Sequence, residues 1–309
     1  MDGGRIQVRD RGAVSKDPGS KGHWRESLVG CCLSMTSEER AVDPCPTIPQ
    51  TFVDPARMND LSREIKGFSG DAKAAEGPPE ESPAEREGCP KVLVKSVVAT
   101  RQDIEVFGEQ LVAEAYSRGF HAARRKAFVA DGSSSNWSVH RKHFSHYTPI
   151  LDFTHAICYV YAAAMAGQPS DVGWHDYCQW AQWLWSGNLT ELMAAVAARS
   201  EALGPPGKDD ETSPAARVDR TLVYLRNQRQ RMKYPEYRRL GLPITSSHIE
   251  STIKQINRRV KGTEKFWDQG AEPLLRLAAD YISETNTFDR FWKNRQQRLK
   301  PMRRYQTAA

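Results

Sequence analysis

The chain has 309 residues, of which 39% are hydrophobic, and it carries a formal net charge of +6. This length and apolar content suit a globular protein with a sizeable core and room for two structural units. The opening residues lack the charged-then-apolar order of a signal peptide, and the longest apolar run, residues 156–166, is too short to span a bilayer. The six cysteines include no Cys-x-x-Cys pair, so we expect reduced thiols in a cytoplasmic protein that does not enter a membrane.

The first half of the chain is predicted to contain short strands, short helices and one linker. Alternating polar and apolar residues favour a strand, and apolar residues at a spacing of three or four favour a helix. In chain order, the expected strands are residues 5–9, 25–35, 126–130 and 149–151, and the expected helices are residues 55–68, 95–118 and 136–144. Residues 69–90 are rich in Pro, Gly, Ala and Glu, which predicts a disordered acidic linker.

Helices are expected to dominate the second half, where Gly and Pro separate the apolar-periodic segments. The expected helices are residues 153–167, 172–186, 189–203, 217–232, 247–261, 271–284 and 287–299, with a polar loop at residues 204–214. Four tryptophans, at positions 174, 180, 183 and 185, crowd one of these segments. Their near-helical spacing favours core packing over the alternative, which is stacking on a nucleic-acid base.

Basic residues are concentrated late in the chain. Residues 226–261 contain ten Lys and Arg but only two Glu, and tyrosines lie among or near them. Such a distribution favours a polyanionic partner over a merely solvated face. By contrast, the His140, His143 and His146 series drifts around a helix and stands beside Arg141 and Lys142, which indicates a basic surface rather than a metal site.

Three aspartates flank predicted strands, and each has a structural explanation. Asp2 stands just before the first strand, where the end of the chain can fray. Asp131 belongs to an Asp-Gly turn, and Asp152 is placed to cap the helix that follows. Together, the Asp-Gly pairs at two strands and a Glu on a basic helix suggest a site of three carboxylates. Oxygen ligands of this kind hold Mg²⁺.

Glu250 is that helix-borne carboxylate, and its segment allows two interpretations. Ser247 and Glu250 have the spacing of a capping box, in which the Glu side chain satisfies a backbone N–H at the helix start. Alternatively, Glu250 binds a divalent metal while the neighbouring Lys and Arg contact phosphates. The two roles are compatible, because a capped first turn would also fix the direction of a ligand.

Long stretches of the chain resemble transposases of bacterial insertion sequences of the ISKra type. The resemblance is carried by MDGGRIQVR with WRESLVGCCLSM, by KSVVATRQDIEVFGEQLVAEA, RRKAFVADGSSSNWSVHRKHF and PILDFTHAICYVYAAA, and most specifically by RRLGLPITSSHIES with INRRVKGTEKFW. It covers nearly all of the chain except the acidic linker and the loop at residues 204–214. These proteins are of the DDE class, are related to the Mutator-like group, and have an RNase H-like fold.

The resemblance implies an α/β fold: an RNase H-like mixed sheet with helices, interrupted by an all-helical insertion. The expected parts are residues 1–152 as the first part of the core, 153–240 as the insertion, 241–270 as the core helix with the third carboxylate, and 271–309 as basic C-terminal helices. In this family the first Asp ends the first strand, the second follows the fourth strand, and the Glu lies on a late helix.

Carried onto this chain, the resemblance makes Asp2, Asp131 and Glu250 the catalytic carboxylates. They would bind two Mg²⁺ ions, or Mn²⁺, for DNA strand cleavage and strand transfer of an insertion sequence. The expected phosphate contacts come from Arg238, Arg239, Lys254, Arg258, Arg259 and Lys261. Related proteins have Cys-x-x-His after the fifth strand, where this chain has Asp152-Phe-Thr-His155. His155 is therefore expected to contact DNA or to orient a water, with capping and packing as the alternative.

The expected partners are DNA, at the element ends and at the target, and further copies of the chain in a homo-oligomer. A nucleoid-associated location in the cytoplasm follows from the DNA partner. Family members carry residues before the first Asp, whereas this chain begins one residue before it. A truncated or internally initiated product is therefore expected. The alternative function is a catalytically defective transposase that acts only as a DNA-binding protein or inhibitor.

Overall fold

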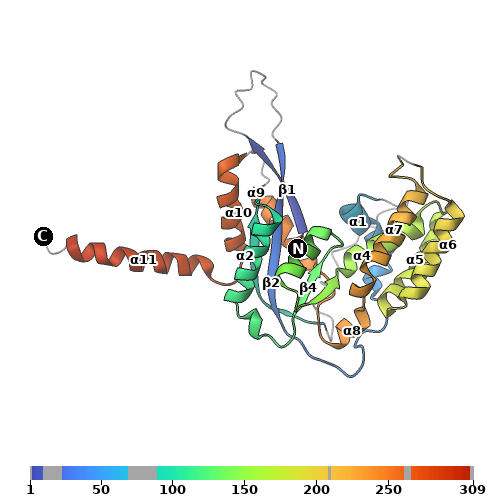
Figure 1. The fold of residues 1–309 in the computed structure, drawn as a ribbon, viewed down its shortest axis with the longest axis horizontal. Helices are drawn as coiled ribbons and strands as arrows, with labels where there is room; N and C mark the ends of the chain where they lie inside the picture. The colour runs from blue at the N-terminus through green and yellow to red at the C-terminus, as the bar shows by residue number, and fades with distance from the viewer. Residues whose placement is uncertain (1, 10–22, 69–88, 208–209, 261–265, 307–309) are drawn as a thin grey trace, which may run out of the picture. The chain divides into compact units, whose positions relative to one another are not determined.

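The computed structural model describes residues 2–9, 23–68, 89–207, 210–260 and 266–306. These residues form two compact units, each assembled from separate parts of the chain (Figure 1). The first unit comprises residues 1–36, 92–123 and 247–309, and the second comprises residues 37–91 and 124–246. We describe each unit by itself. The chain as a whole is mixed α/β and mostly helical, which confirms the coarse fold class.

The first unit is built on a four-stranded sheet with the order β3-β2-β1-β6. Its strands are β1 (Asp2–Arg9), β2 (His23–Met35), β3 (Val92–Thr100) and β6 (Phe266–Trp267). Strands β1, β2 and β3 pair antiparallel, whereas β1 and β6 pair parallel at their ends. The strands expected at residues 5–9 and 25–35 are present. The helix predicted to begin at residue 95 is wrong there, because residues 95–100 belong to β3.

Helices contact both faces of this sheet, as the alternation along β2 shows. Val29 faces a core formed with residues of α9 (Ser247–Val260) and α10 (Asp268–Ile282). Gly30 points the other way, toward Leu111 and Phe107 of α2 (Ile104–Ser117). A Cβ on Gly30 would lie 2.9 Å from a methyl of Leu111, so glycine lets α2 approach the strand closely. The last helix, α11 (Thr287–Gln306), follows α10.

The second unit contains a βαβ element and a helical block. Strand β4 (Ala127–Ala130), helix α3 (Ser134–His143) and strand β5 (Thr148–Leu151) form a parallel two-stranded pair with its crossover helix. The remaining helices are α1 (Pro55–Lys66), α4 (Phe153–Met165), α5 (Ser170–Ser186), α6 (Leu189–Leu203), α7 (Pro214–Gln228) and α8 (Tyr234–Arg239). Short 3-10 turns occur at Gln50–Phe52 and Arg229–Arg231 here, and at Phe120–Ala122 in the first unit.

The core of the second unit surrounds α4, along which nearly every side chain is buried. Phe153 meets the rings of Phe52, Trp185 and Tyr234 edge-on, each at a centroid distance of 5.0 Å. Trp185 and Trp180 are buried, which confirms the packing interpretation for these two tryptophans. This division of the chain differs from the predicted domains, because β4 and β5 group with the helical block rather than with β1–β3.

Two predictions about the environment of the chain meet direct observations. No helix in the described part of the chain is long and apolar enough to cross a bilayer. All six cysteines are free thiols. The acidic linker predicted at residues 69–90 falls almost wholly outside the described residues.

Candidate functional site

Two aspartates lie side by side where strands β4 and β5 end. Ala130 and Leu151 are paired in the parallel register, and Asp131 and Asp152 are the next residues of each chain segment. The backbone N–H of Asp152 donates to the carbonyl of Ala130 at 2.8 Å, so the register continues to the aspartates. The carboxyl ends of parallel strands are where ligands bind in open α/β sheets. This edge is therefore the candidate site of the second unit.

Asp131 is half-exposed and organises the turn between β4 and α3. Its Oδ1 accepts hydrogen bonds from the backbone N–H of Ser133 at 2.9 Å and from Nδ2 of Asn136 at 2.8 Å. These bonds confirm that Asp131 shapes a turn. They also hold the carboxylate in a fixed direction at the strand end, as a metal ligand would require. The structural and ligand interpretations are thus compatible here.

The turn after Asp131 requires glycine because α7 lies directly against it. A Cβ on Gly132 would stand 2.2 Å from the ring of Tyr224. On the same helix, Nε2 of Gln228 donates to the Gly132 carbonyl at 3.2 Å. Tyr224 in turn stacks on Tyr159 of α4, with ring centroids 3.8 Å apart. The backbone beside Asp131 is therefore enclosed by the helical block.

Asp152 is fully buried and caps α4, as its position predicted. Its carboxylate accepts from the backbone N–H of Thr154 at 2.9 Å and from the hydroxyl of Ser246. Nδ1 of His155 lies 2.9 Å from Oδ2. Burial alone would raise the pKa of Asp152, but hydrogen bonds from His155, Ser246 and Thr154, together with the charge of His155, hold it below its ordinary value. Asp152 is therefore an ionised carboxylate in the interior.

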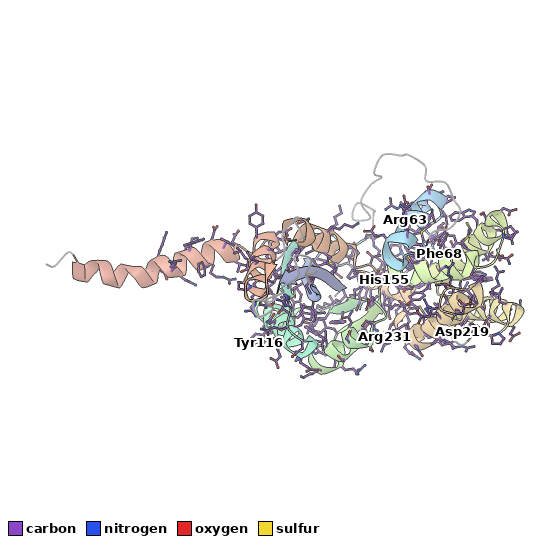
Figure 2. The ribbon with its side chains drawn as sticks, turned by 90° about the horizontal axis from the view of Figure 1, so that it is seen from above. Arg63, Phe68, Tyr116, His155, Asp219 and Arg231 are labelled. Atoms are coloured by element: carbon purple, nitrogen blue, oxygen red, sulfur yellow. The ribbon has the colours of Figure 1, made fainter. Side chains whose placement is uncertain are left out.

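His155, labelled in Figure 2, is fixed by this carboxylate. Its side chain is 12% exposed, and the Asp152 carboxylate directs the N–H of its imidazole to Nδ1. An imidazole oriented in this way presents its other nitrogen, Nε2, in one direction. The structure thus confirms the capping and packing role of this dyad, while a contact of His155 with DNA or water stays a prediction.

The segment before α9 is attached to the same carboxylate. The hydroxyl of Ser246 donates to Asp152, and the N–H of Phe153 donates to the carbonyl of Ile244 at 2.9 Å. Helix α9 begins at Ser247, so Ser246 rather than Ser247 precedes its first turn. Glu250 follows Ser246 by four residues and lies in that turn. The side chains of Ser247 and Glu250 lie outside the described side chains, so the capping box stays a prediction.

Asp2 is the first residue of β1 and pairs with Val29 of β2. It therefore begins its strand, whereas the sequence interpretation placed it just before a strand at residue 5. Its side chain also lies outside the described side chains. Among the described residues, no group of three or more His, Cys, Asp or Glu is arranged to hold a metal ion. The side chains of Asp2 and Glu250 lie outside the described side chains, so the metal role of Asp2, Asp131 and Glu250 stays a prediction.

The predicted phosphate-binding residues differ in their surroundings. Lys254 is exposed on α9, and Arg239 is partly exposed at the end of α8. Arg238 is 6% exposed, and its guanidinium contacts the Asp43 carboxylate and the Trp185 ring, 4.0 Å from the ring centroid. Its prediction as a phosphate contact does not fit this burial. The side chains of Arg258 and Arg259, and all of Lys261, lie outside the described residues.

Sequence reasoning missed the role of Ser246. The residue stands in a run of threonine and serine that reads only as a loop before a helix, and its partner is 94 positions earlier. It also treated Asp152 as a cap alone and gave no sign that the same carboxylate would bind both His155 and Ser246. Comparisons of the chain with protein-family models, with curated proteins and with solved structures find no match.

Proposed function

We propose that the chain is a DDE-type DNA transposase with an RNase H-like core, in which Asp2, Asp131 and Glu250 are the metal ligands. The observation that carries the proposal is the location of the three carboxylates in the secondary structure. Asp2 lies in the first strand, Asp131 directly follows the fourth strand, and Glu250 lies on a late helix beyond a helical block. Asp131 and Glu250 have the locations that the family resemblance implies, whereas Asp2 begins its strand instead of ending it.

The order of elements supports the same interpretation. The antiparallel strands β1 and β2 come first, followed by α1, the antiparallel strand β3 and α2, then the parallel pair β4 and β5 joined by a helix, and then helices α4 to α8. The helical block ends at a segment bonded to Asp152, beside Asp131, and Glu250 follows four residues later. Glu250 is therefore close in sequence to the end of the helical block, as the family resemblance implies for the third carboxylate.

The donors suit hard divalent cations. Carboxylate oxygens are preferred by Mg²⁺ and Mn²⁺, and Asp131 is half-exposed with its direction fixed by Ser133 and Asn136. A pair of such ions would supply activation of a water or 3′-hydroxyl and stabilisation of the leaving oxygen in an in-line displacement at phosphorus. The protein's own contribution is to hold the carboxylates rigidly and to position the DNA backbone with cationic side chains.

His155 has a supporting role in this proposal. Asp152 fixes its ring, and Asp152 follows β5 just as Asp131 follows the paired strand β4. From Nε2, the oriented ring at this edge can accept from a water when neutral, and it can donate to a phosphate oxygen when protonated. Asp152 acts through His155 and Ser246, so it is a positioning residue.

The test is strand cleavage and strand transfer on a plasmid carrying the DNA that flanks the coding sequence, with Mg²⁺ or Mn²⁺. Asp131→Asn keeps the oxygen that accepts from Ser133, so it preserves the turn while removing the charge. We expect it to abolish cleavage and to leave DNA binding nearly unchanged, and we expect the same of Glu250→Gln. Asp171→Asn, at an exposed position in the first turn of α5, is the matched control.

Cleavage by Asp131→Asn at the wild-type rate would refute the metal role. DNA binding without cleavage by the wild-type protein would instead favour the alternative, a DNA-binding protein or inhibitor. Absence of DNA binding at moderate salt would reject both.

A further inference from the structure

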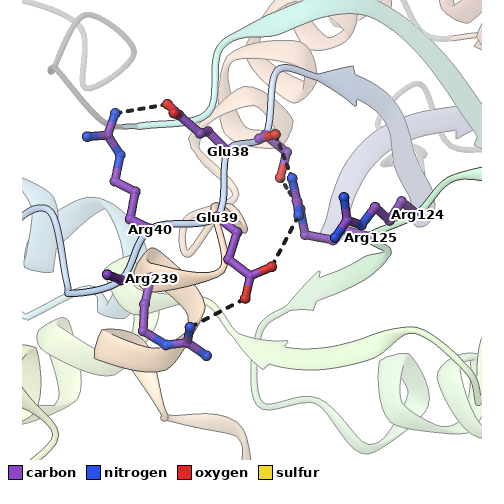
Figure 3. A pocket seen from close by; sticks show the side chains of 8 residues that line it. Glu38, Glu39, Arg40, Arg124, Arg125 and Arg239 are labelled. Atoms are coloured by element: carbon purple, nitrogen blue, oxygen red, sulfur yellow. Dashed lines mark hydrogen bonds and ion pairs between the residues drawn. The ribbon is translucent and has the colours of Figure 1, made fainter.

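An arginine-rich pocket of about 600 Å³ lies in the second unit (Figure 3). We call it the arginine pocket. Its lining residues are Ser37, Glu38, Glu39, Arg40, Ala41, Arg124, Arg125 and Arg239. Four arginines face two glutamates, so the lining carries a formal charge of +2. A concave surface of this charge is complementary to a phosphate group.

The frame of the pocket is held by hydrogen bonds between distant segments. Ser37 accepts from Nε of Arg125 at 2.8 Å, and its own hydroxyl donates to the Gly241 carbonyl at 2.8 Å. The Ser37 carbonyl accepts from a terminal nitrogen of Arg125 at 2.7 Å, and the N–H of Arg40 donates to the Arg239 carbonyl at 2.8 Å. Arg125 is thus oriented before any ligand arrives, which lowers the entropy cost of binding.

Gly241 allows the segments to meet this closely. Its φ is +66°, and a Cβ there would lie 2.4 Å from the carbonyl oxygen of Glu38. Both the backbone conformation and the close approach therefore require glycine. Just before Gly241, the side chain of Arg238 is held in the interior by Asp43 and Trp185, whereas that of the next residue, Arg239, lines the pocket. The two adjacent arginines have separate tasks.

Glu39 occupies the position between two of the cations. Its Oε2 lies 3.7 Å from Arg125, and its Oε1 lies 3.4 Å from Arg239, as the dashed lines in Figure 3 show. Both distances exceed those of a good charge-assisted hydrogen bond, and the Glu39 side chain is 44% exposed. Glu39 therefore bridges the arginines loosely, from a side chain that can turn into solvent.

We propose that the arginine pocket binds a backbone phosphate of DNA, and that Glu39 competes with this phosphate for Arg125 and Arg239. The inference rests on the proposed function for its choice of DNA, since the pocket chemistry itself specifies a phosphate. When the phosphate enters, the Glu39 carboxylate leaves the two guanidiniums. Arg124, which is exposed at the rim, adds a further cation. The pocket is a positioning contact that reads no sequence.

The experiment is a salt titration of binding to a fluorescent DNA duplex with EDTA present, which separates binding from any cleavage. Arg124→Ala and Arg239→Ala should each lower the slope of log K against log salt by about one unit if they remove one phosphate contact. Glu39→Gln keeps the size of the side chain and removes the competing charge. It should tighten binding by about threefold at low salt, the effect of roughly one exposed ion pair, and by less at high salt.

Arg63→Ala is the matched control. Arg63 is an exposed arginine of α1 in the same unit, paired with Asp60 and labelled in Figure 2. It should leave both affinity and slope unchanged. Equal slopes for Arg124→Ala, Arg239→Ala and Arg63→Ala would overturn the proposal, and so would unchanged or weaker binding by Glu39→Gln. The proposal would also be overturned if Arg124→Ala and Arg239→Ala left DNA binding unchanged but weakened binding to anionic lipid vesicles.

The outcome is distinguishable from that of the proposed function. If the arginine variants weaken binding but no strand cleavage is found with Mg²⁺ or Mn²⁺, the pocket stands and the transposase proposal falls. If cleavage is found but the arginine variants bind normally, the transposase proposal stands and the pocket inference falls.

Discussion

Nδ1 of His155 lies 2.9 Å from a carboxylate oxygen of Asp152, one turn along α4, and the carboxylate is completely buried. Leaving a buried carboxylate without donors would cost several kcal/mol, on the order of 3–5 for a broken buried pair. The bonds from His155, Ser246 and Thr154 offset that cost. The dyad therefore stabilises the fold and at the same time orients an imidazole at the edge that carries Asp131.

The first prediction concerns the pH dependence of stability. The pKa of Asp152 is lower in the folded chain than its unfolded value of about 3.9. A carboxyl group with a depressed folded pKa contributes stability above the unfolded pKa and loses it as pH falls through the folded pKa. Asp152→Asn should therefore be destabilised relative to wild type at pH 6, and the gap should shrink below about pH 4.

Urea unfolding of both proteins between pH 2.5 and pH 7 measures this gap. Asp171→Asn, at an exposed position, supplies the reference for a surface aspartate. A gap that stays constant over the whole range would show that the Asp152 charge does not contribute to folding.

The second prediction separates two adjacent arginines. Arg238→Ala removes a buried side chain and leaves the partly buried Asp43 without its cation, so it should cost about 1–3 kcal/mol in the free energy of unfolding. Arg239→Ala removes a partly exposed side chain, so its effect on stability should stay within about 0.5 kcal/mol. Because Arg239 lines the arginine pocket, we expect Arg239→Ala to weaken DNA binding. Equal stability losses in the two variants would contradict this division.

These two arginines also show what a local pattern can predict. The helix at residues 189–203 was predicted to the residue, because Gly187 and Gly204 flank a periodic run that α6 follows from Leu189 to Leu203. By contrast, α11 extends seven residues beyond its predicted end at residue 299, and α8 was not predicted. From their charge, both arginines were predicted to lie on the surface and contact phosphates. Arg238 is buried with its partner Asp43, which lies 195 positions away in sequence. No residue near Arg238 in the sequence indicates that partner.

The error at residues 95–100 has a related cause. Apolar residues there recur at spacings that suit a strand as well as a helix, and pairing with β2 decides for the strand. The true helix start is marked by Asp103, whose side chain accepts from the N–H of Val106. For the candidate site, Asp131 at a turn and Asp152 at a cap were predictable locally. Their alignment through Ala130 and Leu151, and the bond to Ser246, depend on tertiary structure.

The third prediction uses the free thiols to test the sheet of the first unit. Burial, and secondarily the nearby Glu114, raise the pKa of Cys32 to about 12. At pH 8 this thiol is almost wholly protonated, and it is also shielded, so it should react with a thiol reagent only after unfolding. Cys45, which is half-buried in the second unit, should react in the folded protein. Mass spectrometry of labelled peptides identifies the sites, and rapid labelling of Cys32 in native protein would contradict the packing of β2.

The last prediction concerns the backbone beside Asp131. Gly132→Ala places a methyl group 2.2 Å from the Tyr224 ring, so α7 or the turn must shift, at a cost of about 1–3 kcal/mol. Tyr224→Leu removes the ring and loses its stacking on Tyr159, but it makes room for that methyl group. The double variant should therefore be more stable than the sum of the single effects predicts, with a coupling of about 0.5–3 kcal/mol in the free energy of unfolding. Urea unfolding of the four proteins measures this coupling. Strictly additive effects would mean that Tyr224 does not enclose the turn that orients Asp131.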